Sequence, residues 1–230
     1  MSPNYLCRWT DSDTMYLIIV GAGEIGEKLI KLALQNKDDV VVIEKSKERC
    51  DEISKKYDAV VINADAREKE TLIEAGAENA DALIATADDA TNLLVVNLAK
   101  TIGIPSLVSL VTSEENKPMF IEKGVTIFGN PAAFTATYLY RAVRRPMVID
   151  FMTLGNRAEI FKISIPKESK AVGKTVGSMK LPRGVSIIAI ERDNEILIPA
   201  QDTVFKEGDV VTLLARKDKI DKTMSIFFEK

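Results

Sequence analysis

Short runs of β-branched and other apolar residues alternate with longer amphipathic stretches from Met15 to about residue 130. The short runs predict strands at 16–20, 40–43, 59–62, 82–85, 106–111 and 125–128. Between them, apolar residues recur at the spacing of one helix face and predict helices at 24–35, 47–57, 68–75, 89–102 and 114–123. Because strands that alternate with helices are typical of βαβ units, we expect an α/β fold, a Rossmann-like doubly wound parallel sheet covered by helices on both faces.

The pattern changes after the sixth predicted strand. A further helix is expected at about 132–145, because Arg144 and Arg145 lie in its last turn and Pro146 then ends it. Strands expected in the remainder lie at 159–165, 185–191, 195–198 and 209–215, followed by a short helix near 217–227. The predicted domains are a loose N-terminal extension at 1–14, a Rossmann-like domain at 15–146, a linker at 147–157 and a small α+β domain at 158–230.

Composition narrows the chemistry that the chain can carry. Its 230 residues contain no histidine, so the commonest general base and metal ligand is missing, and we assign no catalytic and no metal-binding residue. The two cysteines, Cys7 and Cys50, give no sign of a disulfide framework and suit a reducing cytoplasm. The net charge of -3 without a basic block disfavours nucleic acid as a partner. No apolar run approaches the ~18 residues of a membrane span.

The sequence from Gly21 to Gly26 is a GxGxxG motif that follows a predicted strand and opens a predicted helix. The first glycine permits a tight turn, the second lets the backbone approach a pyrophosphate, and the third lets the helix pack on the strand. The helix N-terminus then offers free amides and a partial positive charge to phosphates. The motif predicts a nucleotide site formed by Gly21, Ala22, Gly23, Glu24, Ile25 and Gly26. A glycine turn that binds no ligand is the alternative.

Glu44 ends the second predicted strand, where a carboxylate can accept hydrogen bonds from both hydroxyls of an adenosine ribose. Since a carboxylate repels a 2′-phosphate, Glu44 favours NAD(H), ATP, ADP or AMP over NADP, although the adjacent Lys45 weakens this preference. An ordinary solvated acid is the other interpretation of Glu44. Glu24 either pairs with Lys28 as a first-turn acid or disfavours a third phosphate.

Two short segments follow the third and fourth predicted strands at the edge where such sheets bind ligands. They are Asp65 with Ala66, and Thr86 with Ala87. Taken one at a time, these four residues are ordinary loop residues. Together they could close over the adenine and the ribose of a nucleotide. We therefore include these four residues, together with Lys45, in the predicted nucleotide site.

Longer segments carry a family resemblance in both predicted domains. In the first domain they are 18–26, 41–44, 63–66, 72–82 and 88–92. In the second they are 172–177, 190–192, 198–203 and 206–209. These segments resemble the TrkA/KtrA-type regulatory subunits of potassium uptake systems, which are built from RCK domains. The segment at 72–82 is far more specific than the glycine loop. Together these segments extend the resemblance from Met15 essentially to the C-terminus.

The resemblance implies a non-enzymatic regulatory subunit that binds NAD(H) or an adenine nucleotide (ADP, AMP or ATP) and gates a membrane potassium transporter or channel. It also implies self-association, as a dimer or an octameric ring, and a cytoplasmic location on the inner face of the cell membrane through the partner. The family's nucleotide contacts carry over to Gly21, Gly23, Glu24, Ile25, Gly26, Glu44, Asp65, Thr86 and Ala87. Family members that bind nucleoside triphosphates commonly have an arginine at this position. This chain has Glu24 instead, and a glutamate there disfavours a bound γ-phosphate.

Several alternatives stay open. An NAD-dependent oxidoreductase could use the same loop, but the chain lacks histidine, and no tyrosine is followed four residues later by lysine. A nucleotide sensor of a different ion transporter would share the two-domain plan. The helix at 132–145 is either the family's crossover helix, packed on a partner subunit, or the sixth helix of one closed domain. The C-terminal domain either binds a second small ligand or ion, or only forms a dimer surface.

Overall fold

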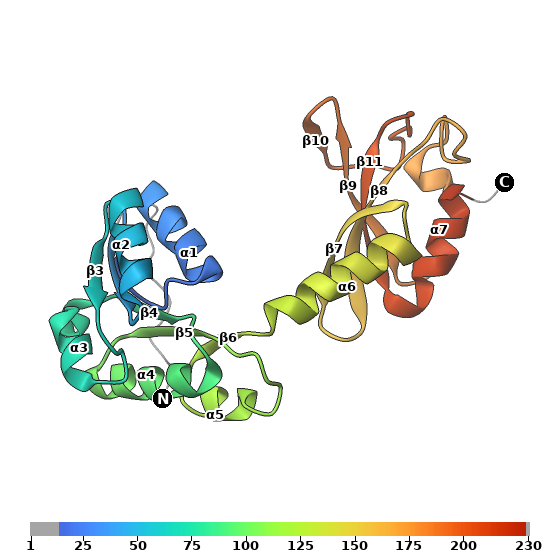
Figure 1. Ribbon diagram of the computed structural model, residues 1–230. Coiled ribbons are helices and arrows are strands. Elements are labelled where there is room, and N and C mark those ends of the chain that lie inside the picture. The colour runs from blue at the N-terminus through green and yellow to red at the C-terminus, as the bar shows by residue number, and fades with distance from the viewer. Residues whose placement is uncertain (1–13, 229–230) are drawn as a thin grey trace. The chain divides into compact units, whose positions relative to one another are not determined.

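The computed structural model describes residues 14–228, and the chain divides into two compact units, with the division along the sequence between Thr135 and Ala136 (Figure 1). Almost all of the predicted extension at 1–14 lies outside the described residues. The predicted domain limits at 146 and 158 stay predictions. None of the helices within 14–228 has the length and apolar character that crossing a membrane requires.

The first unit is built on a six-stranded parallel sheet. Its strands are β1 (Tyr16–Val20), β2 (Asp39–Glu44), β3 (Val60–Asn63), β4 (Ala82–Ala85), β5 (Ser106–Leu110) and β6 (Thr126–Phe128), in the order β3-β2-β1-β4-β5-β6. Its helices are α1 (Glu24–Gln35), α2 (Lys47–Lys56), α3 (Lys69–Glu74), the 3-10 turn Ala77–Asn79, α4 (Asp89–Ile102) and α5 (Lys117–Ile121). This is the doubly wound order, so the predicted fold class is confirmed. The order reverses between β1 and β4, which marks the crevice where such sheets bind ligands.

Alternate residues of the central strand pack against opposite layers of helices. Ile19 of β1 belongs to a core cluster with Ile30 of α1 and Ile53 of α2. Its neighbour Ile18 belongs to the core cluster that contains Val95 of α4. Figure 1 shows α1 and α2 on one side of the sheet and α4 on the other. Because both faces are buried, the central strands are nearly continuous runs of Ile, Val and Leu, which is why the sequence pattern revealed them.

The second unit contains a five-stranded antiparallel sheet in the order β10-β9-β11-β8-β7. The strands are β7 (Val148–Leu154), β8 (Ala158–Ser164), β9 (Val185–Arg192), β10 (Glu195–Leu197) and β11 (Val210–Arg216). The helical elements are α6 (Pro131–Arg144), whose first residues belong to the first unit, the 3-10 turns Val176–Ser178 and Lys217–Lys219, and α7 (Ile220–Phe228). Its core is apolar and includes the buried side chains of Phe161, Val211 and Phe227. The predicted small α+β domain is therefore confirmed in class.

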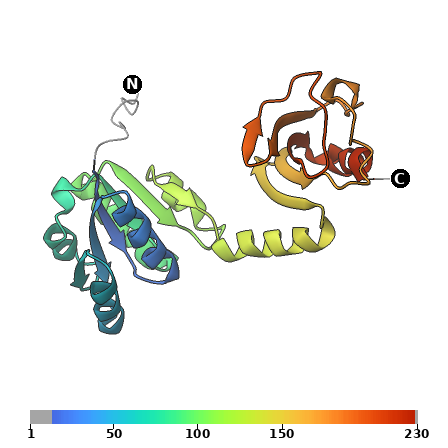
Figure 2. The ribbon, with the colours of Figure 1, turned by 90° about the horizontal axis from the view of Figure 1, so that it is seen from above.

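Most of the segment expected as a linker, 147–157, forms the edge strand β7, into which the chain passes from α6 (Figure 2). The sequence analysis expected no strand here, because five of the seven residues of β7 are exposed and the apolar alternation is weak. The assignment of 147–157 as a linker between domains stays a prediction. Phe151 of β7 stacks on Tyr138 of α6, with ring centroids 4.2 Å apart. Arg141 of α6 forms two hydrogen bonds of 2.8 Å with the buried carboxylate of Glu159 in β8. These contacts join α6 to the second sheet.

Candidate functional site

The glycine loop joins β1 to α1 at the carboxyl edge of the parallel sheet. Gly21 has a φ of +91°, a conformation that residues with side chains rarely adopt. A Cβ on Gly26 would lie 2.0 Å from the carbonyl oxygen of Gly21, so only glycine lets α1 approach β1 this closely. A Cβ on Gly23 would meet no atom within 4 Å. The three glycines therefore differ in role, and the space beside Gly23 is open.

No side chain caps the N-terminus of α1, where Gly23 is the capping residue. In contrast, the Ser46 hydroxyl accepts a hydrogen bond from the first turn of α2, and the Asp88 carboxylate accepts one from the first turn of α4. The first amides of a helix lack partners within the helix and attract anions. The loop thus combines an uncapped helix N-terminus with the open space beside Gly23.

Glu44, at the end of β2, holds the loop through its carboxylate. The backbone N–H of Ala22 donates to Glu44 Oε2 and the N–H of Ser46 donates to Oε1, both at 2.8 Å. Arg49 of α2 donates from Nη2 to the carbonyl oxygen of Ala22 at 2.7 Å. Ala22 is therefore fixed through both its amide and its carbonyl. Since each carboxylate oxygen can accept more than one hydrogen bond, Glu44 retains the capacity to bind ribose hydroxyls.

Arg49 also belongs to an ion-pair network between α1 and α2. Its Nη2 lies 2.9 Å from Glu27 Oε2, and Lys56 Nζ lies 2.5 Å from Glu27 Oε1. Hydrogen bonds from Lys56, Arg49 and Tyr57 lower the pKa of Glu27 to about 2. The sequence analysis missed Arg49, because α2 carries several charged residues and no pattern distinguishes the one that reaches the loop.

Thr86 directly follows β4 and contacts the glycine loop. Its hydroxyl lies 3.0 Å from the carbonyl oxygens of both Val20 and Gly21, which share its single proton. The next residue, Ala87, is held by the buried side chain of Asn92, which accepts from Ala87 N–H and donates to Ala87 O. Asn92 was present in the family motif, but its role in fixing this segment was not predicted. The predicted contact of Thr86 with a nucleotide stays a prediction.

A pocket of about 250 Å³ opens at the carboxyl edge of the sheet, within the first unit. Six residues of the predicted site line it: Gly21, Glu44, Lys45, Asp65, Ala66 and Ala87. The other predicted residues lie outside its lining: Ala22, Gly23, Glu24, Ile25, Gly26 and Thr86. Lining residues that the sequence analysis did not select include Arg67, Asp88, Thr91 and Leu94.

Asp65 and Arg67 form an ion pair in the wall of this pocket. The Arg67 Nε lies 3.0 Å from both carboxylate oxygens of Asp65, and Nη2 lies 2.5 Å from Oδ2. These bonds, together with one from the Arg67 backbone N–H, lower the pKa of Asp65 to about 2. Nearby, hydrogen bonds from the backbone and side chain of Thr91 lower the pKa of Asp88. Both acids are therefore ionised near neutral pH.

Glu24, in the first turn of α1, is largely exposed to solvent. Its carboxylate forms an ion pair of 2.7 Å with Lys28 one turn later, and its side chain is 84% exposed. The hydrogen bond from Lys28 lowers the pKa of Glu24. This geometry supports the interpretation of Glu24 as a first-turn acid, while its effect on a third phosphate stays a prediction.

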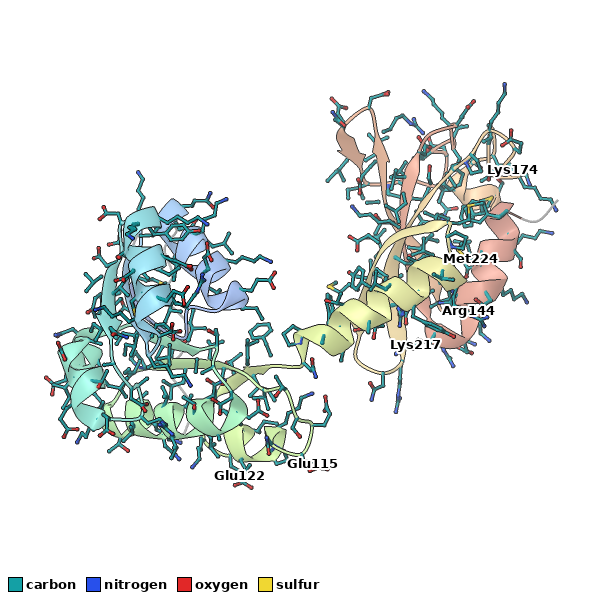
Figure 3. The ribbon with its side chains drawn as sticks, in the orientation of Figure 1. Glu115, Glu122, Arg144, Lys174, Lys217 and Met224 are labelled. Atoms are coloured by element: carbon teal, nitrogen blue, oxygen red, sulfur yellow. The ribbon has the colours of Figure 1, made fainter. Side chains whose placement is uncertain are left out.

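Charged side chains elsewhere extend from the surface, among them Glu115, Glu122, Arg144 and Lys217 (Figure 3). Within residues 14–228, no three side chains of Cys, Asp or Glu are grouped so that they could hold a metal ion. The pocket at the carboxyl edge of the first sheet is therefore the candidate site that the sequence motif and the geometry share.

The fold and the glycine loop define a Rossmann-type domain followed by a small antiparallel α+β domain. The TrkA-N domain model matches residues 17–131 and the TrkA-C domain model matches residues 160–227. The chain therefore belongs to the TrkA family of Trk system potassium uptake proteins, which confirms the resemblance found in the sequence.

Related sequences support this assignment along almost the whole chain. The Trk system potassium uptake protein TrkA homolog of Methanothermobacter thermautotrophicus is 32% identical over 215 residues, which cover 93% of this chain and 99% of the relative. The homolog of Pyrococcus abyssi is 29% identical over 225 residues and is covered to 99%. The homolog of Archaeoglobus fulgidus is 32% identical, but the chain spans only 50% of its length.

Among solved structures, the GsuK channel is similar with a TM-score of 0.66 and 15% identity, over 96% of this chain and 41% of that chain. A structure described as the GsuK channel bound to NAD is similar with a TM-score of 0.65. At this identity the likeness shows the fold alone.

Proposed function

We propose that the chain is a non-enzymatic regulatory subunit whose first domain binds NAD(H) or an adenine nucleotide and thereby gates a potassium transporter or channel in the membrane. The observation that carries the proposal is the uncapped N-terminus of α1 beside the open space at Gly23, next to a pocket lined by Glu44. The phosphates would lie at the helix N-terminus and the ribose at Glu44. Membership of a potassium uptake family and the fold shared with an NAD-bound channel support this reading.

The carboxylates around the pocket support binding rather than catalysis. Asp65 is paired with Arg67, Asp88 caps α4, and the pKa values of both are lowered. A general acid or base works best with a pKa near the operating pH. Neither group meets that condition, and the Glu44 carboxylate accepts hydrogen bonds from two backbone amides of the loop and of α2. The sequence also offers no histidine to replace them.

Regulation by a nucleotide requires a difference in affinity between two arrangements of the protein, typically about 1–3 kcal/mol. We propose that the chain self-associates as a dimer or ring and lies on the cytoplasmic face of the membrane. The change between its two arrangements would then alter the activity of the membrane transporter or channel to which it is bound. Glu44 supports NAD(H), ADP or AMP over NADP, since a 2′-phosphate would meet its carboxylate.

The test is calorimetric titration of the full chain with NAD, NADH, ADP, AMP, ATP and NADP. Glu44→Ala should abolish or strongly weaken binding, whereas Glu48→Ala, an exposed acid in the first turn of α2, should not. Potassium uptake would then be measured with the chain and a Trk-type membrane partner, with and without the tightest ligand. Absence of nucleotide binding by the unaltered chain, or uptake that ignores a bound nucleotide, would contradict the proposal.

A further inference from the structure

Two side chains in the pocket wall, those of Arg67 and Leu94, were not among the residues predicted to bind the nucleotide. Arg67 enters the pocket from the segment after β3, and Leu94 enters it from α4. Arg67 has a side chain that is 53% exposed, and Leu94 is 50% exposed. A planar cation and an apolar side chain therefore lie in the walls of the same cavity, and both are accessible to a ligand.

The ion pair with Asp65 orients the Arg67 guanidinium. Two nitrogens of the group, Nε and Nη2, bind the one carboxylate, and the backbone N–H of Arg67 binds it as well. Exposed ion pairs contribute little to the free energy of unfolding, so the pair of Asp65 and Arg67 is not explained by a role in stability. A guanidinium held by two of its nitrogens loses freedom of rotation and presents one face in a defined direction.

The position of Arg67 along the sheet indicates which part of a nucleotide it meets. Ligands of such sheets lie across the carboxyl ends of the strands. With the phosphates at the N-terminus of α1 and the ribose at Glu44 of β2, the base continues toward the segments that follow β3 and β4. Those segments bring Arg67 and Ala87 to the pocket, and α4 adds Leu94.

We propose that Arg67 stacks on the base of the bound nucleotide, which lies between its guanidinium and the side chain of Leu94. Guanidinium planes stack on nucleobases, and an aliphatic side chain can cover the opposite face. This inference rests on the proposed nucleotide binding and adds that the base is recognised by stacking. A purine should therefore bind more tightly than a pyrimidine, because its stacking surface is larger.

The experiment titrates the full chain with AMP, ADP and UMP by calorimetry, in parallel with Arg67→Ala, Arg67→Lys and Lys69→Ala. Lys69 is the matched control because it is an exposed cation two residues further along the chain that does not line the pocket. Both Arg67 variants should bind AMP and ADP about ten-fold more weakly, within the range that removal of a stacking partner usually costs. Their preference for AMP over UMP should shrink, and Lys69→Ala should retain it. Circular dichroism would verify that each variant is folded.

Three results would overturn the inference. If Arg67→Lys binds like the unaltered chain, charge alone is sufficient and stacking is wrong. If Arg67→Ala weakens the binding of ADP more than the binding of AMP, the guanidinium contacts a phosphate and stacking is wrong. If Arg67→Ala changes nothing while Glu44→Ala removes binding, the inference fails and the proposed function stands. A chain that binds no nucleotide at all would refute both.

Discussion

Replacing Gly26 with alanine should destabilise the first domain, and the structure gives the reason. The new Cβ would lie 2.0 Å from Gly21 O and 3.1 Å from Thr86 Oγ1. Gly21 cannot easily yield, because its N–H donates to Ile43 O at 2.9 Å and its carbonyl accepts from the Thr86 hydroxyl at 3.0 Å. The first turn of α1 must therefore move away from β1.

The magnitude follows from two opposing effects. Overpacking a close contact typically costs about 1–3 kcal/mol, and a clash with backbone belongs at the upper end. Alanine in place of glycine within a helix returns up to about 1 kcal/mol. Gly26→Ala should therefore lower the free energy of unfolding by about 2 kcal/mol. For a domain of this size, that corresponds to a melting temperature about 8 °C lower, which differential scanning calorimetry would measure.

Gly23→Ala is the matched control in the same loop. A Cβ at Gly23 meets nothing within 4 Å, and its φ of -65° suits alanine. The free energy of unfolding should therefore fall by at most about 1 kcal/mol, the usual loss when alanine replaces a favoured N-cap residue. The methyl group would nevertheless occupy the space beside the helix N-terminus. Affinity for ADP and NAD should fall at least about ten-fold, or about 1.4 kcal/mol. Unaltered stability of Gly26→Ala, or unaltered affinity of Gly23→Ala, would refute the reasoning.

Three further predictions concern other parts of the molecule. Arg141→Ala leaves the buried Glu159 carboxylate without its partner and should destabilise the second unit by about 3–5 kcal/mol in urea unfolding, whereas Lys162→Ala, in a more exposed pair, should cost at most about 1 kcal/mol. Asn92→Ala should cost about 1–3 kcal/mol, since its buried amide makes three hydrogen bonds to backbone; a neutral effect on thermal unfolding would contradict this. Burial raises the pKa of Asp89, but hydrogen bonds from Thr112, Asn116 and Ser113 outweigh this effect and lower the pKa to about 2 from an ordinary 3.8. The stabilisation by the ionised Asp89 should therefore be complete above about pH 5 and be lost as the pH falls toward about 2. Asp89→Asn should flatten the unfolding free energy over that range, and an unchanged slope would exclude the contribution.

The fold of the first unit could be predicted because its strands are buried on both faces. All six predicted strands form, and β1 has the bounds expected from the sequence. In contrast, β7 was not predicted because it is a largely exposed edge strand, and its residues therefore lack a clear alternation of apolar and polar positions. Burial, rather than strand propensity alone, determined which elements the pattern revealed.

Site residues could be predicted where their role depends on the local sequence, such as a loop motif or the end of a strand. They could not be predicted where their role depends on segments that meet only in the folded protein. Gly21 and Glu44 follow from a loop and a strand end, and both line the pocket. Arg67 and Asn92 gain their roles from segments that meet only in the folded sheet, so no spacing in the sequence identified them. Thr86 was at the expected edge, but its hydroxyl binds the glycine loop.

One carboxylate connects the structural and the proposed binding roles of this site. Glu44 fixes the glycine loop through Ala22 N–H and the start of α2 through Ser46 N–H, and it also lines the pocket. Hydroxyls that bind Glu44 would therefore act on the same oxygens that hold the loop and α2. Arg49 of α2 binds both the carbonyl oxygen of Ala22 and the carboxylate of Glu27 in α1. A displacement of Ala22 would therefore change contacts of α1 and of α2. A ligand bound at Glu44 could therefore change the positions of α1 and α2 through Ala22. A regulatory site requires such a coupling between ligand and helices, whereas a site that only holds a cofactor does not.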